Sequence, residues 1–222
     1  MPLNFNTMRT NMILGQILPV QSLTTSLRQG VETLARELEL PERLKPLAYC
    51  DQELVIWEKR FILAPPAFFK LVSAANITQK ETVLDIGCTT GYTTGILSYC
   101  SKKVIGIEAS ETLVNQARIF LAKNSLTNAE VFKADPLSGY PEKAPYNVII
   151  VEGALKSIPA CLSGQLLEGG RLLFFKKRSP DEIATAICAY KKNGHLFEEE
   201  LFEWQASYFE PSLESPESCD FD

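Results

Sequence analysis

Several kinds of functional residue are scarce in this sequence. Its 222 residues include one histidine, and the six cysteines form no C-x-x-C pair, which disfavours a zinc site and a disulfide framework. The apolar stretch at 12–20 is too short to cross a membrane, and no clear signal-peptide cleavage site follows it. We therefore expect a cytoplasmic protein with no metal and no membrane partner.

Charge is unevenly distributed along the chain. The formal net charge is −5, and residues 198–222 contain nine acids but no lysine or arginine, so the rest of the chain is mildly basic. A nucleic-acid-binding protein would concentrate its basic residues on one face, and neither part of the chain does so. We expect no nucleic-acid partner. Residues 211–222, rich in Pro, Ser, Glu and Asp, are expected to be disordered.

The middle of the chain alternates between strand and helix patterns. Such alternation predicts a doubly wound, Rossmann-like α/β fold with a mostly parallel sheet and helices on both faces. We expect a helical cap over residues 1–75, the α/β domain over 76–210 and a tail over 211–222. The expected strands are 82–86, 103–108, 130–133, 147–151 and 171–175, and the expected helices between them are 92–99, 111–124 and 157–167.

The same patterns predict the elements on either side of this region. Apolar residues recurring every three or four positions predict helices, with Leu38 on the stripe of one of them. The pair Gly169-Gly170 is read as a helix stop, and Asn193-Gly194 as a turn. The expected elements are helices at 8–18, 26–40, 67–75 and 180–192, a short strand at 53–57, and one or two closing strands within 196–208 that could be antiparallel.

The stretch T-V-L-D-I-G-C-T-T-G-Y at 82–92 organises the rest of the chain. Its first five residues are typical of a buried parallel strand carrying an acid, Asp85, near its end. Gly87 permits a tight turn, Gly91 permits close approach of a ligand or strand, and the following helix offers unpaired amides. The spacing is not the dinucleotide fingerprint G-x-G-x-x-G. It resembles the D/E-x-G-x-G-x-G loop of class I S-adenosylmethionine methyltransferases, with Thr89 at the middle glycine.

Three further acids follow predicted strands. Glu108, Asp135 and Glu152 are expected on the same edge of the sheet as Asp85, where α/β proteins bind ligands. A carboxylate at Glu108 can accept both ribose hydroxyls of an adenosine, and one at Asp135 can accept the exocyclic amine of adenine. Taken singly, Glu108 also reads as an exposed acid, and Asp135 as a turn residue before Pro136. Glu152 either contacts substrate or a methionine amine, or is solvated.

The sequence offers no obvious nucleophile with a base beside it. Cys88 lies inside the glycine loop with no histidine nearby, so it reads as a small residue that fills the loop. His195 follows the Asn193-Gly194 turn and reads as a surface residue, and no elbow motif for a Ser-His-Asp triad is present.

Four segments together carry a more specific pattern: V-L-D-I-G-C-T-T-G-Y at 83–92, V-I-G-I-E at 104–108, A-D-P-L-S-G-Y-P-E-K-A-P-Y-N-V-I-I-V at 134–151 and I-P-x-x-L-x-x-Q-L-x-x-G-G-R-L at 158–172. They resemble the protein-L-isoaspartate O-methyltransferase family. The resemblance implies S-adenosyl-L-methionine as cofactor, S-adenosyl-L-homocysteine as product, and carboxyl methylation of isoaspartyl residues in a protein or peptide substrate. The cofactor-binding residues that it implies are Asp85, Gly87, Cys88, Gly91, Glu108, Ala109, Asp135 and Pro136.

Three positions depart from the family pattern. Thr89 replaces the middle glycine of the loop, Leu63 stands where the family has its active-site serine, and Phe61 stands where a threonine is common. A catalytic residue is therefore not assigned, although methyl transfer to an ionised carboxylate needs orientation more than a general base. Three alternatives stay open: a methyltransferase of the same fold with another acceptor, a non-catalytic module that binds S-adenosylmethionine, and a nicotinamide enzyme.

Overall fold

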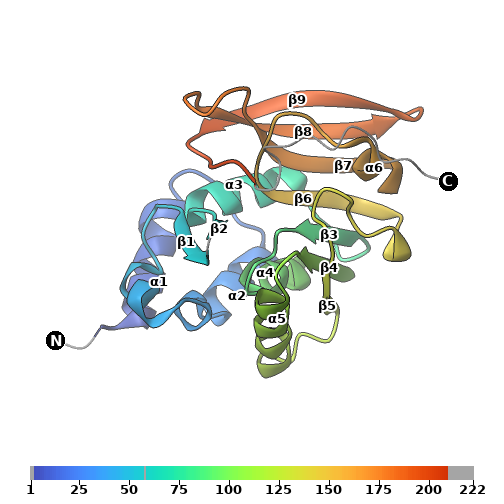
Figure 1. Ribbon diagram of the computed structural model, residues 1–222. Coiled ribbons are helices and arrows are strands. Elements are labelled where there is room, and N and C mark those ends of the chain that lie inside the picture. Colours follow the sequence, from blue (N-terminus) through green and yellow to red (C-terminus); the bar gives the residue numbers. More distant parts are fainter. Residues whose placement is uncertain (1–2, 58, 210–222) are drawn as a thin grey trace.

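A seven-stranded sheet forms the centre of the molecule. The computed structural model describes residues 3–57 and 59–209. The strands are β3 (Thr82–Ile86), β4 (Lys103–Glu108), β5 (Ala129–Lys133), β6 (Tyr146–Leu155), β7 (Leu166–Lys176), β8 (Ala184–Lys192) and β9 (His195–Trp204). Their spatial order is β5-β4-β3-β6-β7-β8-β9 (Figure 1). The first five in this order are parallel, whereas β8 and β9 are antiparallel to their neighbours. The expected mostly parallel α/β sheet is therefore confirmed.

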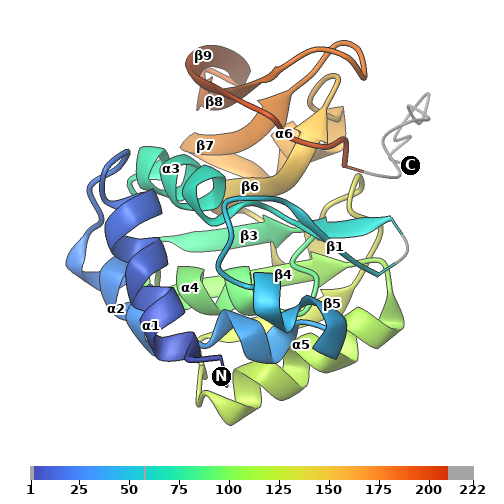
Figure 2. The ribbon, with the colours of Figure 1, turned by 90° about the vertical axis from the view of Figure 1, so that its left-hand side faces the viewer.

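Helices cover both faces of the sheet. Successive side chains of each central strand point to opposite faces, and both sets are apolar, so each face needs a cover. Val83 and Val104 join the core beneath the N-terminal helices, while Leu84 and Ile105 join a second core beneath α6. Figures 1 and 2 show α6 across the sheet from the N-terminal helices. No helix among the described residues could span a bilayer. The helices are α1 (Phe5–Met12), α2 (Thr25–Thr33), α3 (Pro65–Ala75), α4 (Tyr92–Cys100), α5 (Glu111–Lys123) and α6 (Ala160–Gln165).

The N-terminal helices are shorter than the apolar pattern predicts. α1 continues only as a π-helical segment, Ile13–Ile17. α2 begins as expected, since the Thr24 hydroxyl accepts the Leu27 N–H at 3.3 Å, but it ends at Thr33 rather than at residue 40. The expected place of Leu38 in the core is wrong, because its side chain is 67% exposed. Beyond the end of the helix the chain turns Arg36 inward, where this residue is 1% exposed.

The first short strands form a hairpin beside the sheet. β1 (Leu54–Trp57) confirms the expected strand, and β2 (Arg60–Ile62) pairs with it in antiparallel register. The two prolines that follow β2 open α3, where a missing N–H costs nothing because the first helical amides have no intrahelical partner. The hairpin thus brings residues 60–63 over the edge of the sheet.

Two expectations for the C-terminal half are wrong. Residues 184–192 form strand β8 and not a helix, because β8 pairs on both sides and its buried alanines pack against the sheet. Gly169-Gly170 lies inside β7, since α6 already ends at Gln165. The Asn193-Gly194 turn is confirmed, with φ values of 52° and 76° that suit a two-residue hairpin. The closing antiparallel strand is also confirmed as β9, whereas residues 211–222 lie outside the described residues.

Candidate functional site

The glycine loop joins β3 to α4 through three residues of left-handed backbone. Gly87, Thr89 and Gly91 have φ values of 86°, 46° and 90°. The loop turns at Gly87 as expected. Packing requires a glycine at position 91, because a Cβ there would lie 2.9 Å from the Ala117 Cβ of α5. Thr89 is the strained member, since a β-branched residue rarely adopts a positive φ.

Glu108 ends β4 and lies directly beside this loop. Its side chain is 0% exposed, so the reading of an exposed strand-end acid is wrong. Oε1 accepts the N–H groups of Ala109 at 2.8 Å and Ser110 at 3.3 Å. Oε2 accepts the Thr89 N–H at 3.2 Å and Nη2 of Arg60 at 2.8 Å. The carboxylate is therefore held rigidly at the ligand-binding edge of the sheet.

Asp85 and Glu152 are two further buried acids at this edge, and they have fewer hydrogen-bond donors than Glu108. They are 0% and 1% exposed, so a solvated Glu152 is excluded. Asp85 Oδ2 accepts the Thr94 hydroxyl at 2.7 Å, whereas Asp85 Oδ1 and both Glu152 oxygens meet no donor among the described residues. Burial raises the pKa of both carboxyls, and the Asp85 charge raises the pKa of Glu152 further. When either carboxyl is protonated, it gains the donor that both acids lack as ionised carboxylates.

Two side chains that the sequence did not single out fill the space in front of Gly87. A Cβ placed on this glycine would lie 2.7 Å from Phe209 Cζ and 2.9 Å from Arg60 Nη2. The Arg60 guanidinium lies 4.6 Å from the centre of the Phe209 ring. An arginine inside the apolar run 60–66 was an available signal for Arg60. No local signal marks Phe209, because its position depends on where the chain returns after β9.

The residues expected near adenine lie at the ends of β4 and β5. Glu108 is opposite Lys133 in the sheet, which brings Asp135 to the same edge. The Asp135 side chain accepts the Leu137 N–H at 3.1 Å and the Ser138 hydroxyl at 2.7 Å, so it does form the alternative turn. Asp135 and Ala109 are exposed, whereas Pro136 is buried. This part of the edge is therefore open to solvent.

The segment that carries Leu63 passes over the same edge and is fully buried. Leu63 is 1% and Phe61 5% exposed. The Leu63 carbonyl accepts Nη2 of Arg36 at 2.8 Å, and this guanidinium lies 5.5 Å from the centre of the Tyr92 ring. Burial lowers the pKa of Arg36. Arg36 was not among the predicted site residues, although a basic residue within the predicted helix 26–40 was a usable signal. Its bond fixes the main chain at the position of the family's serine.

The two remaining reactive side chains take no part in a catalytic pair. Cys88 is fully buried, and burial together with the nearby carboxylates raises the pKa of its thiol well above the usual value. The thiol therefore stays protonated and fills the loop, as expected. His195 is exposed at the start of β9, which confirms its reading as a surface residue.

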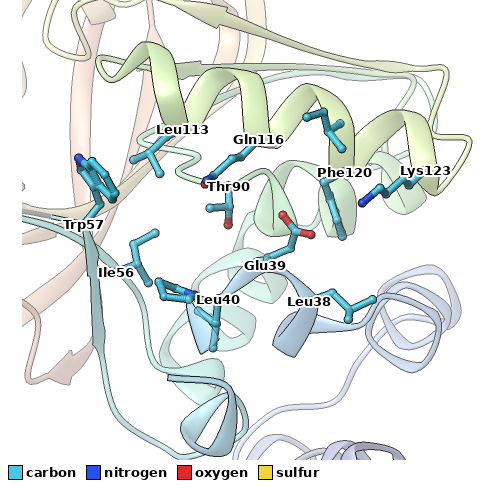
Figure 3. Close-up of a pocket in the computed structure, with 12 residues that line it drawn as sticks. Leu38, Glu39, Leu40, Ile56, Trp57, Thr90, Leu113, Gln116, Phe120 and Lys123 are labelled. Atoms are coloured by element: carbon cyan, nitrogen blue, oxygen red, sulfur yellow. The ribbon is translucent and has the colours of Figure 1, made fainter. Parts of the chain in front are cut away.

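A separate cavity opens behind the loop, between α5 and the N-terminal segments. Its volume is about 350 Å³, and Thr90 is the loop residue in its wall (Figure 3). The Glu39 side chain points into it, and burial raises the pKa of this carboxyl to about 7. None of the four acids at the sheet edge lines this cavity. The cavity therefore shares the glycine loop with the site around Gly87, through Thr90, but none of these acids.

Comparisons with known proteins agree with the architecture. A sequence model of the family described as Protein-L-isoaspartate(D-aspartate) O-methyltransferase matches residues 16–199. The protein-L-isoaspartate O-methyltransferase of Helicobacter pylori (strain J99) is 32% identical over 198 residues, which is 89% of this chain and 94% of that protein. The one from Methanoculleus marisnigri is 35% identical over 167 residues, 75% of each chain.

Solved structures show the same fold. A protein-L-isoaspartate O-methyltransferase superposes with a TM-score of 0.79 at 20% identity, over 95% of this chain and 67% of the other. A candidate member from Plasmodium falciparum, in complex with S-adenosyl-L-homocysteine, gives 0.73 at 19% identity, over 93% and 98%.

The open sheet, the glycine loop and the acids at the strand ends define the class I methyltransferase fold. Within that class, the extent of the sequence match decides the family. The chain belongs to the protein-L-isoaspartate O-methyltransferase family.

Proposed function

We propose that this protein uses S-adenosyl-L-methionine to methylate the carboxyl group of L-isoaspartyl residues in proteins or peptides. The family match over residues 16–199 carries the proposal. The geometry of the sheet edge supports it, because a rigidly held carboxylate stands beside a left-handed glycine loop. This arrangement suits the ribose of an adenosine.

The chemistry of the site residues fits such a cofactor. Glu108 would hold the ribose hydroxyls, the loop around Gly87 and Asp85 would face the methionine end, and the exposed edge at Asp135 would face adenine. Glu108 supports this role because its oxygens are already fixed by neighbouring N–H groups. Arg60 and Phe209 occupy space in front of Gly87, so both side chains must move when the cofactor binds.

The reaction requires little acid–base chemistry from the protein. S-adenosyl-L-methionine supplies an electrophilic methyl group on a sulfonium. An isoaspartyl carboxylate is ionised at neutral pH, so the chain needs to hold it in line with that methyl group and exclude water. Arg36 contributes by fixing the main chain at Leu63. The apolar side chains of Leu63 and Phe61 contribute by desolvating the acceptor side.

The direct test measures methyl transfer from labelled S-adenosyl-L-methionine to an isoaspartyl peptide, with the same peptide in its aspartyl form as the control. Transfer to the isoaspartyl peptide alone is the expected result. Binding of S-adenosyl-L-homocysteine without transfer to either peptide would reject isoaspartyl methylation, and it would support the non-catalytic alternative unless another acceptor is found.

A second candidate function is methylation of a different acceptor by the same fold. The observation that favours it is the complete burial of Leu63, which offers no hydroxyl to orient an isoaspartyl carboxylate. Leu63→Ser restores the hydroxyl, and Leu63→Ala creates the same space without one. A gain in isoaspartyl transfer in the serine variant alone would favour a repair enzyme that has lost the serine hydroxyl at position 63. No gain in isoaspartyl transfer in the serine variant would favour another acceptor.

The proposed setting is a reducing compartment, the cytoplasm, with a protein or peptide substrate as the partner. The structure contains five free cysteines among its described residues, which a reducing environment would keep as thiols. They are Cys50, Cys88, Cys100, Cys161 and Cys188.

A further inference from the structure

After β9 the chain returns to the ligand-binding edge, where Phe209 enters it. The Ala154 N–H donates to the Ser207 carbonyl at 2.9 Å, and the Phe209 N–H donates to the Ala154 carbonyl at 2.8 Å. These two bonds add the segment to the end of β6, directly after Glu152 and Gly153. The Phe209 side chain is consequently buried at 0% exposure.

Phe209 lies between the two glycines that border the site. A Cβ on Gly153 would lie 3.0 Å from the Phe209 Cβ, and a Cβ on Gly87 would lie 2.7 Å from its Cζ. The ring therefore fills the gap between the ends of β3 and β6. Rotation of the ring would free the side next to Gly87 but leave the Phe209 Cβ beside Gly153. Opening the gap at both strand ends therefore requires the main chain to shift and the bond between the Phe209 N–H and the Ala154 carbonyl to break.

Arg60 completes the obstruction on the ribose side. Its guanidinium lies over the Phe209 ring and donates to Glu108 Oε2 at 2.8 Å. The Arg60 side chain is 11% exposed and that of Glu108 is 0% exposed, so water screens this ion pair little. Arg60 thus occupies an acceptor that a ribose hydroxyl would use, and Phe209 holds Arg60 in that place.

We propose that Phe209 and Arg60 together form a plug, which fills the cofactor site of the free protein and must leave before the cofactor binds. This inference rests on the proposed function, because it concerns the same site. Binding then selects the fraction of molecules in which the plug is open, and the measured dissociation constant is raised by the inverse of that fraction. Phe209 thereby sets the cofactor affinity without contacting the cofactor.

The test compares Phe209→Ala with the wild-type protein in titrations with S-adenosyl-L-homocysteine. The matched control is Phe197→Ala, which removes the same ring from β9, where it is 58% exposed. We expect Phe209→Ala to bind at least tenfold more tightly and Phe197→Ala to bind like the wild type. The ligand-free Phe209→Ala protein should also melt at a lower temperature, because it loses buried packing. A purely structural Phe209 would lower the melting temperature without any gain in affinity.

Hydrogen exchange on the wild-type protein provides a second readout that does not need a variant. Saturating S-adenosyl-L-homocysteine should accelerate exchange of the Phe209 amide, whose bond to Ala154 breaks, while it slows exchange in the glycine loop. Equal affinities for Phe209→Ala and wild type, with a Phe209 amide that stays protected in the complex, would overturn the plug and leave the proposed function standing. Absence of binding by both proteins would instead overturn the proposed function.

Discussion

Replacing Glu152 by glutamine should stabilise the ligand-free protein at neutral and alkaline pH. Glu152 and Asp85 are both buried, and as ionised carboxylates they offer each other no hydrogen-bond donor. An amide at position 152 donates to Asp85 Oδ1 without taking up a proton. The expected gain at pH 8 is about 1–3 kcal/mol, the usual cost of a buried polar group without a partner.

The pH dependence of this gain follows from the raised pKa of the pair. In the unfolded chain these carboxyls titrate near pH 4. Well below that pH the folded and the unfolded protein both hold their protons, and the pair costs nothing. Above that pH the folded protein retains a proton that the unfolded chain has lost, so stability falls as the pH rises toward the folded pKa. The advantage of Glu152→Gln should therefore be small near pH 4 and grow through neutral pH.

Urea denaturation of wild-type and Glu152→Gln protein at pH 4.5, 6 and 8 measures this difference. Glu200→Gln is the control, because Glu200 is exposed on β9 and loss of a solvated charge changes stability by at most about 0.5 kcal/mol. Arg60 and Glu108 face the same pair and are retained in both variants. If the difference in unfolding free energy between wild type and Glu152→Gln stayed constant with pH, proton uptake by the pair would be refuted. A constant difference would mean that neither acid takes up a proton over this pH range.

Substitutions at three further positions test the loop and its neighbours. Leu63→Ser and Leu63→Ala should each cost about 2–5 kcal/mol in urea denaturation, and a loss below 1 kcal/mol would contradict the burial of Leu63. Thr89→Gly should raise stability by up to about 1 kcal/mol by relieving left-handed backbone, and destabilisation would contradict that strain. Gly87→Ala should cost about 2 kcal/mol or more. This cost should shrink by at least about 1 kcal/mol in a Phe209→Ala background. An unchanged cost would contradict the contact between a Cβ at position 87 and the Phe209 ring.

Local patterns in the sequence were sufficient for the parallel half of the fold. The β-branched run 82–86 and the glycine loop after it specify a strand and a turn whichever residues surround them, because both depend on local backbone preference. The same holds for Glu108, whose place at a strand end follows from the length of the preceding strand. Family membership was also readable, because it depends on motif spacing and not on contacts.

Tertiary structure alone decided the features that depend on distant parts of the chain. Residues 184–192 form a strand because β7 and β9 pair with them, and their own sequence is compatible with a helix. α2 ends at Thr33, and Arg36 beyond it reaches the carbonyl of Leu63, 27 residues away. Phe209 fills the site through a distant contact as well. Its burial results from pairing with Ala154, and no short-range pattern encodes a contact between residues so far apart.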